Sequence, residues 1–95
     1  MLGMGEDGHT ASLFPGFVDD PTALTQTVFD APKPPPERVS LSVAALQACR
    51  QQLVLVTGAG KVGALAQWRG GARLPIALAV RADACLLVDA AAYGE

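Results

Sequence analysis

The residues best suited to chemistry lie near the start of the chain, between residues 3 and 15. This segment, GMGEDGHTASLFP, holds the single histidine of the chain, His9, together with Asp7 and the hydroxyl residues Thr10 and Ser12. An imidazole titrates near neutral pH and can take a proton from water, and a neighbouring carboxylate can fix its orientation. The segment therefore predicts a general base at His9, with Asp7 either orienting the ring or meeting a polar group of a substrate.

Three glycines in the same segment, Gly3, Gly5 and Gly8, predict a folded loop that wraps a ligand. Glycine tolerates cramped backbone and lets main-chain N–H groups approach a bound group closely. We expect the N–H groups around Gly5 and Gly8 to donate to a negatively charged oxygen. Ser12 is expected to hydrogen-bond nearby backbone rather than to act as a nucleophile, because the chain has no Gly-x-Ser-x-Gly motif around it.

Residues 32–36 contain four prolines; the cation Lys33 lies among them, and a second cation, Arg38, follows two residues after the last proline. Proline fixes extended backbone and excludes helix, so this segment is predicted to be a stiff connector. A stiff connector can hold Lys33 and Arg38 toward an anionic ligand at a low entropic cost. The alternative is a rigid surface turn that carries two solvated charges.

The rest of the chain predicts alternating strands and helices that would position these residues. We expect strands at residues 38–42, 51–57 and 84–88, and helices at residues 43–49, 61–68 and 89–92. A helical turn is expected at residues 10–14, and either a helix or an edge segment at 74–80. The apolar run in the strand at 51–57 is typical of a parallel sheet buried on both faces. This alternation predicts an α/β layer architecture, in which ligands bind beyond the carboxyl ends of the strands.

A Gly58-x-Gly60-x-x-Gly63 spacing follows one of these strands and matches a dinucleotide-binding fingerprint. The fingerprint also needs an acidic residue at the end of the next strand, whereas Asp83 precedes that strand. We therefore interpret the glycines as a strand-to-helix turn and expect Trp68, at the end of the helix, to pack in the core. No cofactor is expected, and one histidine without spaced partner ligands does not predict a metal site.

Composition limits the classes of partner. The 95 residues are enough for one small domain, and the net charge of −2 without a basic block argues against nucleic acid. We find no targeting segment and no apolar run long enough to span a membrane. Cys49 and Cys85 lack metal-type spacing and are expected to be buried free thiols, which favours a cytoplasmic location.

Residues 2–16, LGMGEDGHTASLFPG, resemble the signature of the 6-phosphogluconolactonase family, which belongs to the glucosamine-6-phosphate isomerase/6-phosphogluconolactonase superfamily. Residues 31–42, and residues 53–58 followed by Lys61, are similar to later blocks of that family. The resemblance implies a Rossmann-like fold: an open, mostly parallel, doubly wound sheet with flanking helices. In the family this loop follows a buried strand in the middle of a larger chain, whereas here no strand is expected before it. Residues 1–95 are therefore expected to form a single partial domain, the C-terminal part of the family's domain.

The same resemblance implies an activity and a site. The activity is hydrolysis of 6-phospho-D-glucono-1,5-lactone to 6-phosphogluconate in the oxidative pentose phosphate pathway, with water activated by His9. The residues implied to contact the sugar-phosphate lactone are Gly5, Asp7, Gly8, Lys33 and Arg38.

Two other functions remain open. A glucosamine-6-phosphate deaminase or isomerase has a related loop that ends in Phe-Asn-Glu-Pro, and residues 12–15, SLFP, favour the lactonase instead. A non-catalytic sugar-phosphate-binding domain is the other alternative, although no DNA-binding helix pair of a regulator is present. Because 51% of the residues are hydrophobic, we also expect an exposed apolar face. That face would bind the missing N-terminal half or a second copy of the chain.

Overall fold

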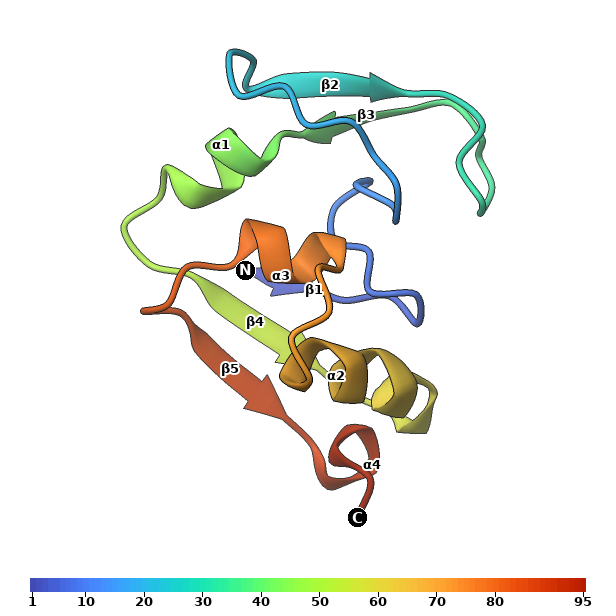
Figure 1. Cartoon of the computed structure of the whole chain (residues 1–95), viewed down its shortest axis with the longest axis vertical. Helices are drawn as coiled ribbons and strands as arrows, with labels where there is room; N and C mark the ends of the chain where they lie inside the picture. Colours follow the sequence, from blue (N-terminus) through green and yellow to red (C-terminus); the bar gives the residue numbers. More distant parts are fainter.

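The computed structural model describes all 95 residues and contains a three-stranded sheet, a separate two-stranded hairpin and several short helices (Figure 1). The elements in chain order are β1 (Leu2–Gly3), β2 (Thr25–Val28), β3 (Arg38–Leu41), α1 (Val43–Gln47), β4 (Leu53–Val56), the 3-10 helix η1 (Ala59–Lys61), α2 (Val62–Arg69), α3 (Pro75–Ala79), β5 (Cys85–Val88) and α4 (Ala90–Tyr93). None of the helices has the length and apolar character that a membrane span requires.

The three-stranded sheet has the order β1-β4-β5, and all of its strands are parallel. Leu2 lies opposite Val54, and Val56 lies opposite Val88. This arrangement confirms the mixed α/β fold. It also corrects one expectation, because the two-residue strand β1 does precede the glycine loop. The loop therefore leaves the sheet at the carboxyl end of a parallel strand, where ligands bind in open α/β folds.

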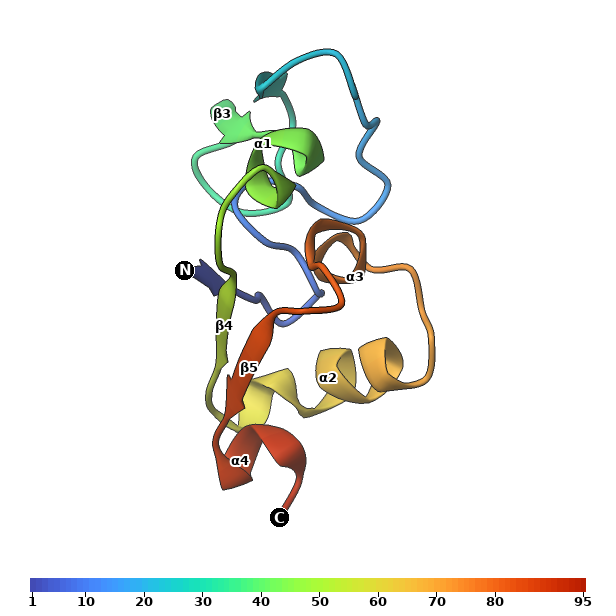
Figure 2. The ribbon, with the colours of Figure 1, turned by 90° about the vertical axis from the view of Figure 1, so that its left-hand side faces the viewer.

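The core forms between this sheet and the helices on one of its sides. Figure 2 shows the sheet almost edge-on, with α2 and α3 on the same side. The buried side chains of this core are those of Met4, Val54, Val56, Ala64, Leu65, Ile76 and Ala92. Trp68 packs against this cluster, as predicted, and the apolar segment at residues 74–80 forms the helix α3.

The other side of the sheet is open, which corrects the expectation of strands buried on both faces. Leu55 in β4 is 41% exposed, and Leu87 in β5 is 49% exposed. Val54 and Val56, which alternate with Leu55, are fully buried. Side chains alternate between the two faces of a strand, and the helices of this chain cover only one face.

Both cysteines are free and exposed, so the expectation of buried thiols was wrong. Cys49 follows α1 on the surface. Cys85 begins β5, an edge strand whose residues are largely exposed.

The second sheet is an antiparallel hairpin: β3 lies within the strand expected at residues 38–42, but its pairing with β2 was not predicted. Strands β2 and β3 pair with Thr25 opposite Leu41 and Val28 opposite Arg38. The proline-rich segment is therefore the connecting loop of a hairpin. Ser42 follows β3 and caps α1 as predicted, since its hydroxyl accepts a hydrogen bond from the Ala45 N–H at 3.2 Å.

Asp89 caps α4 as predicted, and the same carboxylate has a second role. It accepts hydrogen bonds from the N–H of Ala92 at 2.8 Å and from the N–H of Gly58 at 3.1 Å. One side chain therefore joins the start of α4 to the turn that follows β4. This contact fixes the turn beside the carboxyl ends of the strands.

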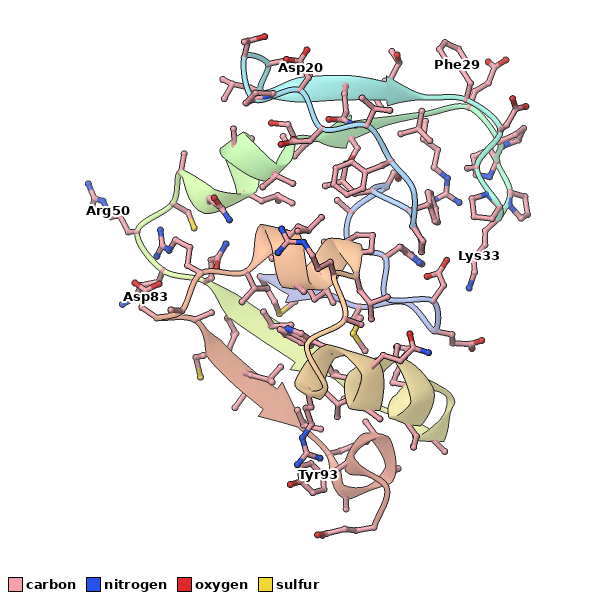
Figure 3. All side chains as sticks on the ribbon, viewed as in Figure 1. Asp20, Phe29, Lys33, Arg50, Asp83 and Tyr93 are labelled. Atoms are coloured by element: carbon pink, nitrogen blue, oxygen red, sulfur yellow. The ribbon has the colours of Figure 1, made fainter.

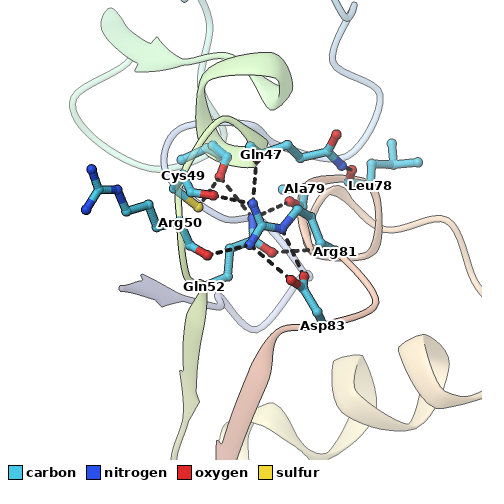
Figure 4. Close-up of polar contacts among 9 residues, drawn as sticks. Gln47, Cys49, Arg50, Gln52, Leu78, Ala79, Arg81 and Asp83 are labelled. Carbon is cyan, nitrogen blue, oxygen red and sulfur yellow. Dashed lines mark hydrogen bonds and ion pairs between the residues drawn. The ribbon is translucent and has the colours of Figure 1, made fainter.

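Arg81 and Gln52 join the segment after α1 to the segment after α3 (Figure 4). The buried Gln52 amide donates to Leu46 O and Ala79 O at 2.9 Å each, and its oxygen accepts from the Arg81 N–H at 2.6 Å. The Arg81 guanidinium donates to the carbonyls of Gln47, Cys49 and Arg50 and to the Asp83 carboxylate. The guanidinium thus satisfies carbonyl groups left free after α1.

We expect Arg81→Met to lower the free energy of unfolding by about 1–2 kcal/mol, because it removes several charge-assisted hydrogen bonds while keeping much of the apolar stem. Urea denaturation followed by circular dichroism measures this difference. Arg73→Met is the matched control, since Arg73 is exposed and forms no hydrogen bond. Equal stabilities of the two variants would show that the Arg81 contacts contribute nothing.

Candidate functional site

The glycine loop after β1 is closed by its own backbone. The N–H of Gly5 donates to His9 O at 2.8 Å, and the N–H of Gly8 donates to Gly5 O at 3.0 Å. Gly8 has φ +85°, a left-handed conformation that favours glycine. A Cβ at Gly60 would lie 3.2 Å from a carboxylate oxygen of Glu6, so the loop also lies beside the turn that follows β4.

Two contacts anchor this loop to the core. The Ile76 N–H, in the first turn of α3, donates to Gly8 O at 3.0 Å. The Thr10 hydroxyl donates to Gly3 O at 2.8 Å, and Thr10 is almost completely buried. The next residues form a tight turn with a bridge between Thr10 and Leu13, and Ala11 has φ +50°. The expected helical turn at residues 10–14 is therefore absent, because its hydrogen bonds follow a different pattern.

The N–H groups of Gly5 and Gly8 are both occupied inside the loop. Among the N–H groups expected to donate to a substrate oxygen around these glycines, those of Gly5 and Gly8 themselves are therefore not free. Their role in this structure is to shape the loop. Gly5 in particular leaves room for the histidine, because a Cβ there would lie 2.0 Å from both Cε1 and Nδ1 of His9.

His9 and Asp7 form a hydrogen-bonded pair at the tip of the loop. His9 Nδ1 lies 2.5 Å from Asp7 Oδ1, and the same oxygen accepts from the His9 backbone N–H at 3.0 Å. A carboxylate accepts hydrogen bonds, so Nδ1 carries the proton and the lone pair is on Nε2. Nε2 has no hydrogen-bond partner in the chain, and the His9 side chain is 19% exposed. The free nitrogen is therefore available to accept a proton.

The contacts with His9 also act on Asp7. Partial burial raises the pKa of the Asp7 carboxyl, but the hydrogen bonds from the His9 side chain and backbone outweigh it and hold the pKa below its usual value. Asp7 is therefore a carboxylate at neutral pH. Its negative charge would stabilise an imidazolium formed at His9.

Lowering the pH should weaken the loop through Asp7. Because the folded pKa is depressed, the contribution of Asp7 to stability is complete above its usual pKa and is lost as pH falls through the folded value. We expect part of the loss of stability below about pH 4 to disappear in Asp7→Asn. Urea midpoints between pH 2.5 and 6 measure this effect. Asp19→Asn, which changes an exposed carboxylate without a hydrogen bond, should retain the wild-type acid dependence.

Phe14 connects the histidine to the hairpin. Phe14 is 6% exposed, and the centre of its ring lies 4.6 Å from the centre of the His9 ring, with an angle of 37° between the planes. On the hairpin side, the Arg38 guanidinium carbon lies 5.2 Å from the centre of the same ring. Arg38 also donates to the Ser12 hydroxyl at 3.4 Å. The tertiary structure thus brings Arg38 to the neighbourhood of His9, with Phe14 in contact with both.

The two cations, Arg38 and Lys33, differ in the hydrogen bonds and ion pairs that they form. Arg38 donates to the carbonyls of Lys33, Pro34 and Pro35 at 2.8–3.2 Å, so it also holds the hairpin loop in shape. Lys33 is exposed and forms no ion pair. Figure 3 shows the Lys33 side chain extending from the connecting loop toward the side of the molecule where the glycine loop lies.

Two open pockets adjoin these residues. One, of about 280 Å³, is lined by Gly3, Met4, Gly5, His9, Thr10 and Ala11. The other, of about 380 Å³, lies between the turn at residues 14–17 and the hairpin loop, and Phe14 and Ser12 are among its lining residues. Phe14, which lines one pocket and contacts the histidine beside the other, is the site residue that sequence analysis missed. Its place inside the quoted motif, in residues 12–15, was a signal, but no spacing argument singled it out.

A histidine held by a carboxylate, on a loop at the carboxyl end of a parallel strand, defines an α/β protein with a site for proton-transfer chemistry. A comparison with models of protein families matches residues 1–88 to the one described as glucosamine-6-phosphate isomerases/6-phosphogluconolactonase. The chain belongs to this family.

Individual relatives agree with this assignment. The chain is 46% identical over 74 residues to the 6-phosphogluconolactonase of Mycobacterium tuberculosis, a match that covers 76% of this chain and 30% of that protein. The human 6-phosphogluconolactonase is 42% identical over 67 residues, covering 68% of this chain and 26% of that protein. The crystal structure of 6-phosphogluconolactonase from Leishmania guyanensis superposes with a TM-score of 0.78 at 31% identity, covering 98% of this chain and 39% of that one. The chain therefore spans about a third of the length of these relatives.

Proposed function

We propose that this chain carries the general base of a 6-phosphogluconolactonase, which hydrolyses 6-phospho-D-glucono-1,5-lactone to 6-phosphogluconate in the oxidative pentose phosphate pathway. The observation that supports the proposal is the set of contacts made by the two ring nitrogens of His9. Its Nδ1 is held by Asp7, its Nε2 is unpartnered, and the ring lines a pocket. This is the arrangement that a base acting on water requires.

The reaction follows from this geometry. Water gives a proton to Nε2 of His9 while its oxygen bonds to the lactone carbonyl carbon, and the carbonyl oxygen becomes negatively charged. Collapse of this intermediate breaks the bond from the carbonyl carbon to the ring oxygen. The ring oxygen takes the proton back from the imidazolium, and the new carboxylic acid ionises in water. Asp7 holds the ring in place and stabilises its positive charge between the two proton transfers.

We assign the binding of the substrate's phosphate group to the cations of the hairpin. Lys33 has no ion-pair partner and is free to turn toward an anion, whereas Arg38 is held beside Phe14 near the histidine. A guanidinium and an ammonium are suitable partners for a phosphate group. Gly5 and Gly8 contribute by shaping the loop around the sugar.

The location of this activity is proposed to be the cytoplasm. Both cysteines are free thiols, which is typical of proteins kept in a reducing compartment.

The test is hydrolysis of freshly prepared 6-phosphogluconolactone, compared with its spontaneous rate. The chain is assayed alone and together with the part of the Mycobacterium tuberculosis relative that lies outside the 74 matched residues. We expect hydrolysis above the spontaneous rate in the combined sample. A spontaneous rate in both samples, with glucosamine 6-phosphate deaminated instead, would assign the other activity in the family's description. No turnover of either substrate would leave sugar-phosphate binding as the function.

A further inference from the structure

The hydrogen bond to Asp7 restrains the His9 ring at one atom only. It fixes the position of Nδ1 but leaves the ring free to tilt about that nitrogen. Nε2, the proposed acceptor of the proton, lies across the ring from this fixed point and moves when the ring tilts. A second contact is therefore needed to set the direction in which the Nε2 lone pair points.

Phe14 makes such a contact. The centre of its ring lies 4.6 Å from the centre of the His9 ring, a distance typical of two aromatic rings that pack together. Phe14 is also buried, so its ring cannot move away from the histidine without leaving a gap in a closely packed region. The tilt of the imidazole thus depends on where the Phe14 ring is held.

The hairpin holds the Phe14 ring through Arg38 and Ser40. The Arg38 guanidinium carbon lies 5.2 Å from the centre of the ring, within the range of a cation–π contact. Hydrogen bonds to the Ser12 hydroxyl and to three carbonyls of the hairpin loop fix the guanidinium. The hydroxyl of the buried Ser40, in β3, accepts from the Ser12 backbone N–H at 3.0 Å. The hairpin therefore contacts both the backbone before Phe14 and the ring itself.

We propose that Phe14 is a positioning residue for the general base: held by Arg38 of the hairpin, it sets the tilt of the His9 ring and so the direction of Nε2. This inference rests on the proposed function of His9. Loss of the ring should lower the rate of the reaction, because a small displacement of a catalytic group is costly. It should leave substrate binding largely intact, because the hydrogen bonds that fix Arg38 do not involve the Phe14 ring.

The test separates kcat from KM in lactone hydrolysis, using the combination of polypeptides that is active without substitutions. We expect Phe14→Leu to lower kcat about tenfold or more and to change KM by less than about threefold. Phe14→Tyr keeps a ring, beside a pocket of about 380 Å³ that has room for the hydroxyl, and should retain the wild-type kcat. Leu65→Val is the matched control. It shortens a buried side chain of the core cluster, to which Phe14 does not belong, and should also retain the wild-type kcat.

Nuclear magnetic resonance of the chain alone reports the position of the ring independently of activity. His9 is the single histidine, so its ring protons are readily identified. One α proton of Gly5 points at this ring, since a Cβ in its place would lie 2.0 Å from Cε1 of His9. The nuclear Overhauser effect between this proton and the Cε1 proton should weaken in Phe14→Leu. It should persist in Phe14→Tyr and Leu65→Val.

Circular dichroism confirms that each variant folds, and Phe14→Met, which keeps more of the volume, replaces Phe14→Leu if that variant does not. An unchanged kcat and Overhauser effect in Phe14→Leu would overturn the positioning role and leave the proposed function standing. Equal losses of kcat in Phe14→Leu and Leu65→Val, or in Phe14→Leu and Phe14→Tyr, would also overturn it. Absence of lactone hydrolysis in the wild type would refute the proposed function instead, and the Overhauser effect would then decide whether Phe14 positions the ring.

Discussion

Replacing His9 with glutamine is expected to reduce lactone hydrolysis by about 10²–10⁴-fold, the range that a positioned general base contributes. Glutamine can still hydrogen-bond to Asp7, so the loop keeps its shape while the group that accepts the proton from water is lost. The measurement is the enzymatic rate above the spontaneous rate, using the combination of polypeptides that shows activity with wild-type His9.

Asp7→Asn separates a base from a structural histidine. It keeps the imidazole that takes the proton from water but loses the charge that holds the ring, so it should retain an activity weaker than that of the wild type and stronger than that of His9→Gln. Unchanged hydrolysis in a folded His9→Gln variant would falsify the assignment of the base.

Gly5→Ala is expected to have the second largest effect, a loss of about 10²-fold in hydrolysis, because a shift of about 1 Å in a catalytic group can cost that much. The added methyl would lie 2.0 Å from two atoms of the His9 ring and 3.0 Å from Asp7 Oδ1. The ring must therefore turn away from its present position or leave the carboxylate. The backbone of the core has no part in this clash, so the fold should persist.

Gly63→Ala is the matched control for this substitution. Gly63 lies in α2 with no atom within 4 Å of an added Cβ, so alanine fits there and favours the helix. The variant should hydrolyse the lactone at the wild-type rate. Equal activity of Gly5→Ala and Gly63→Ala would mean that the position of the imidazole seen here is not the one that catalyses the reaction.

Local sequence was sufficient to predict the elements that depend on contacts between residues close together in the chain. The caps at Ser42 and Asp89 were predicted because an oxygen side chain at the start of a helix bonds to nearby backbone N–H groups. The strand β4 was predicted from its continuous apolar run. The prediction that both faces of β4 are buried was wrong. Burial depends on what packs against the strand, and Leu55 faces a side that this chain does not cover.

The hairpin shows the limit of local patterns. Residues 27–30 have strand-like content, yet pairing of β2 with β3 depends on the chain reversing through the proline-rich loop. Arg38 stabilises that loop by donating to three carbonyls of the loop itself, and no spacing rule indicates such contacts. The place of Arg38 over the Phe14 ring depends in turn on where the whole hairpin lies.

The sequence by itself determined which residue is the candidate base and indicated a tightly bent loop around it. A single imidazole two residues from a carboxylate, in a segment that glycines allow to bend tightly, already indicates proton transfer because these properties belong to the residues and their near neighbours. Tertiary structure decided the rest: that Nε2 is the free nitrogen, that the Gly5 and Gly8 N–H groups are occupied, and that Phe14 lies between the histidine and the hairpin cation. These facts depend on contacts between segments far apart in the chain, and such contacts exist only after the segments have packed together.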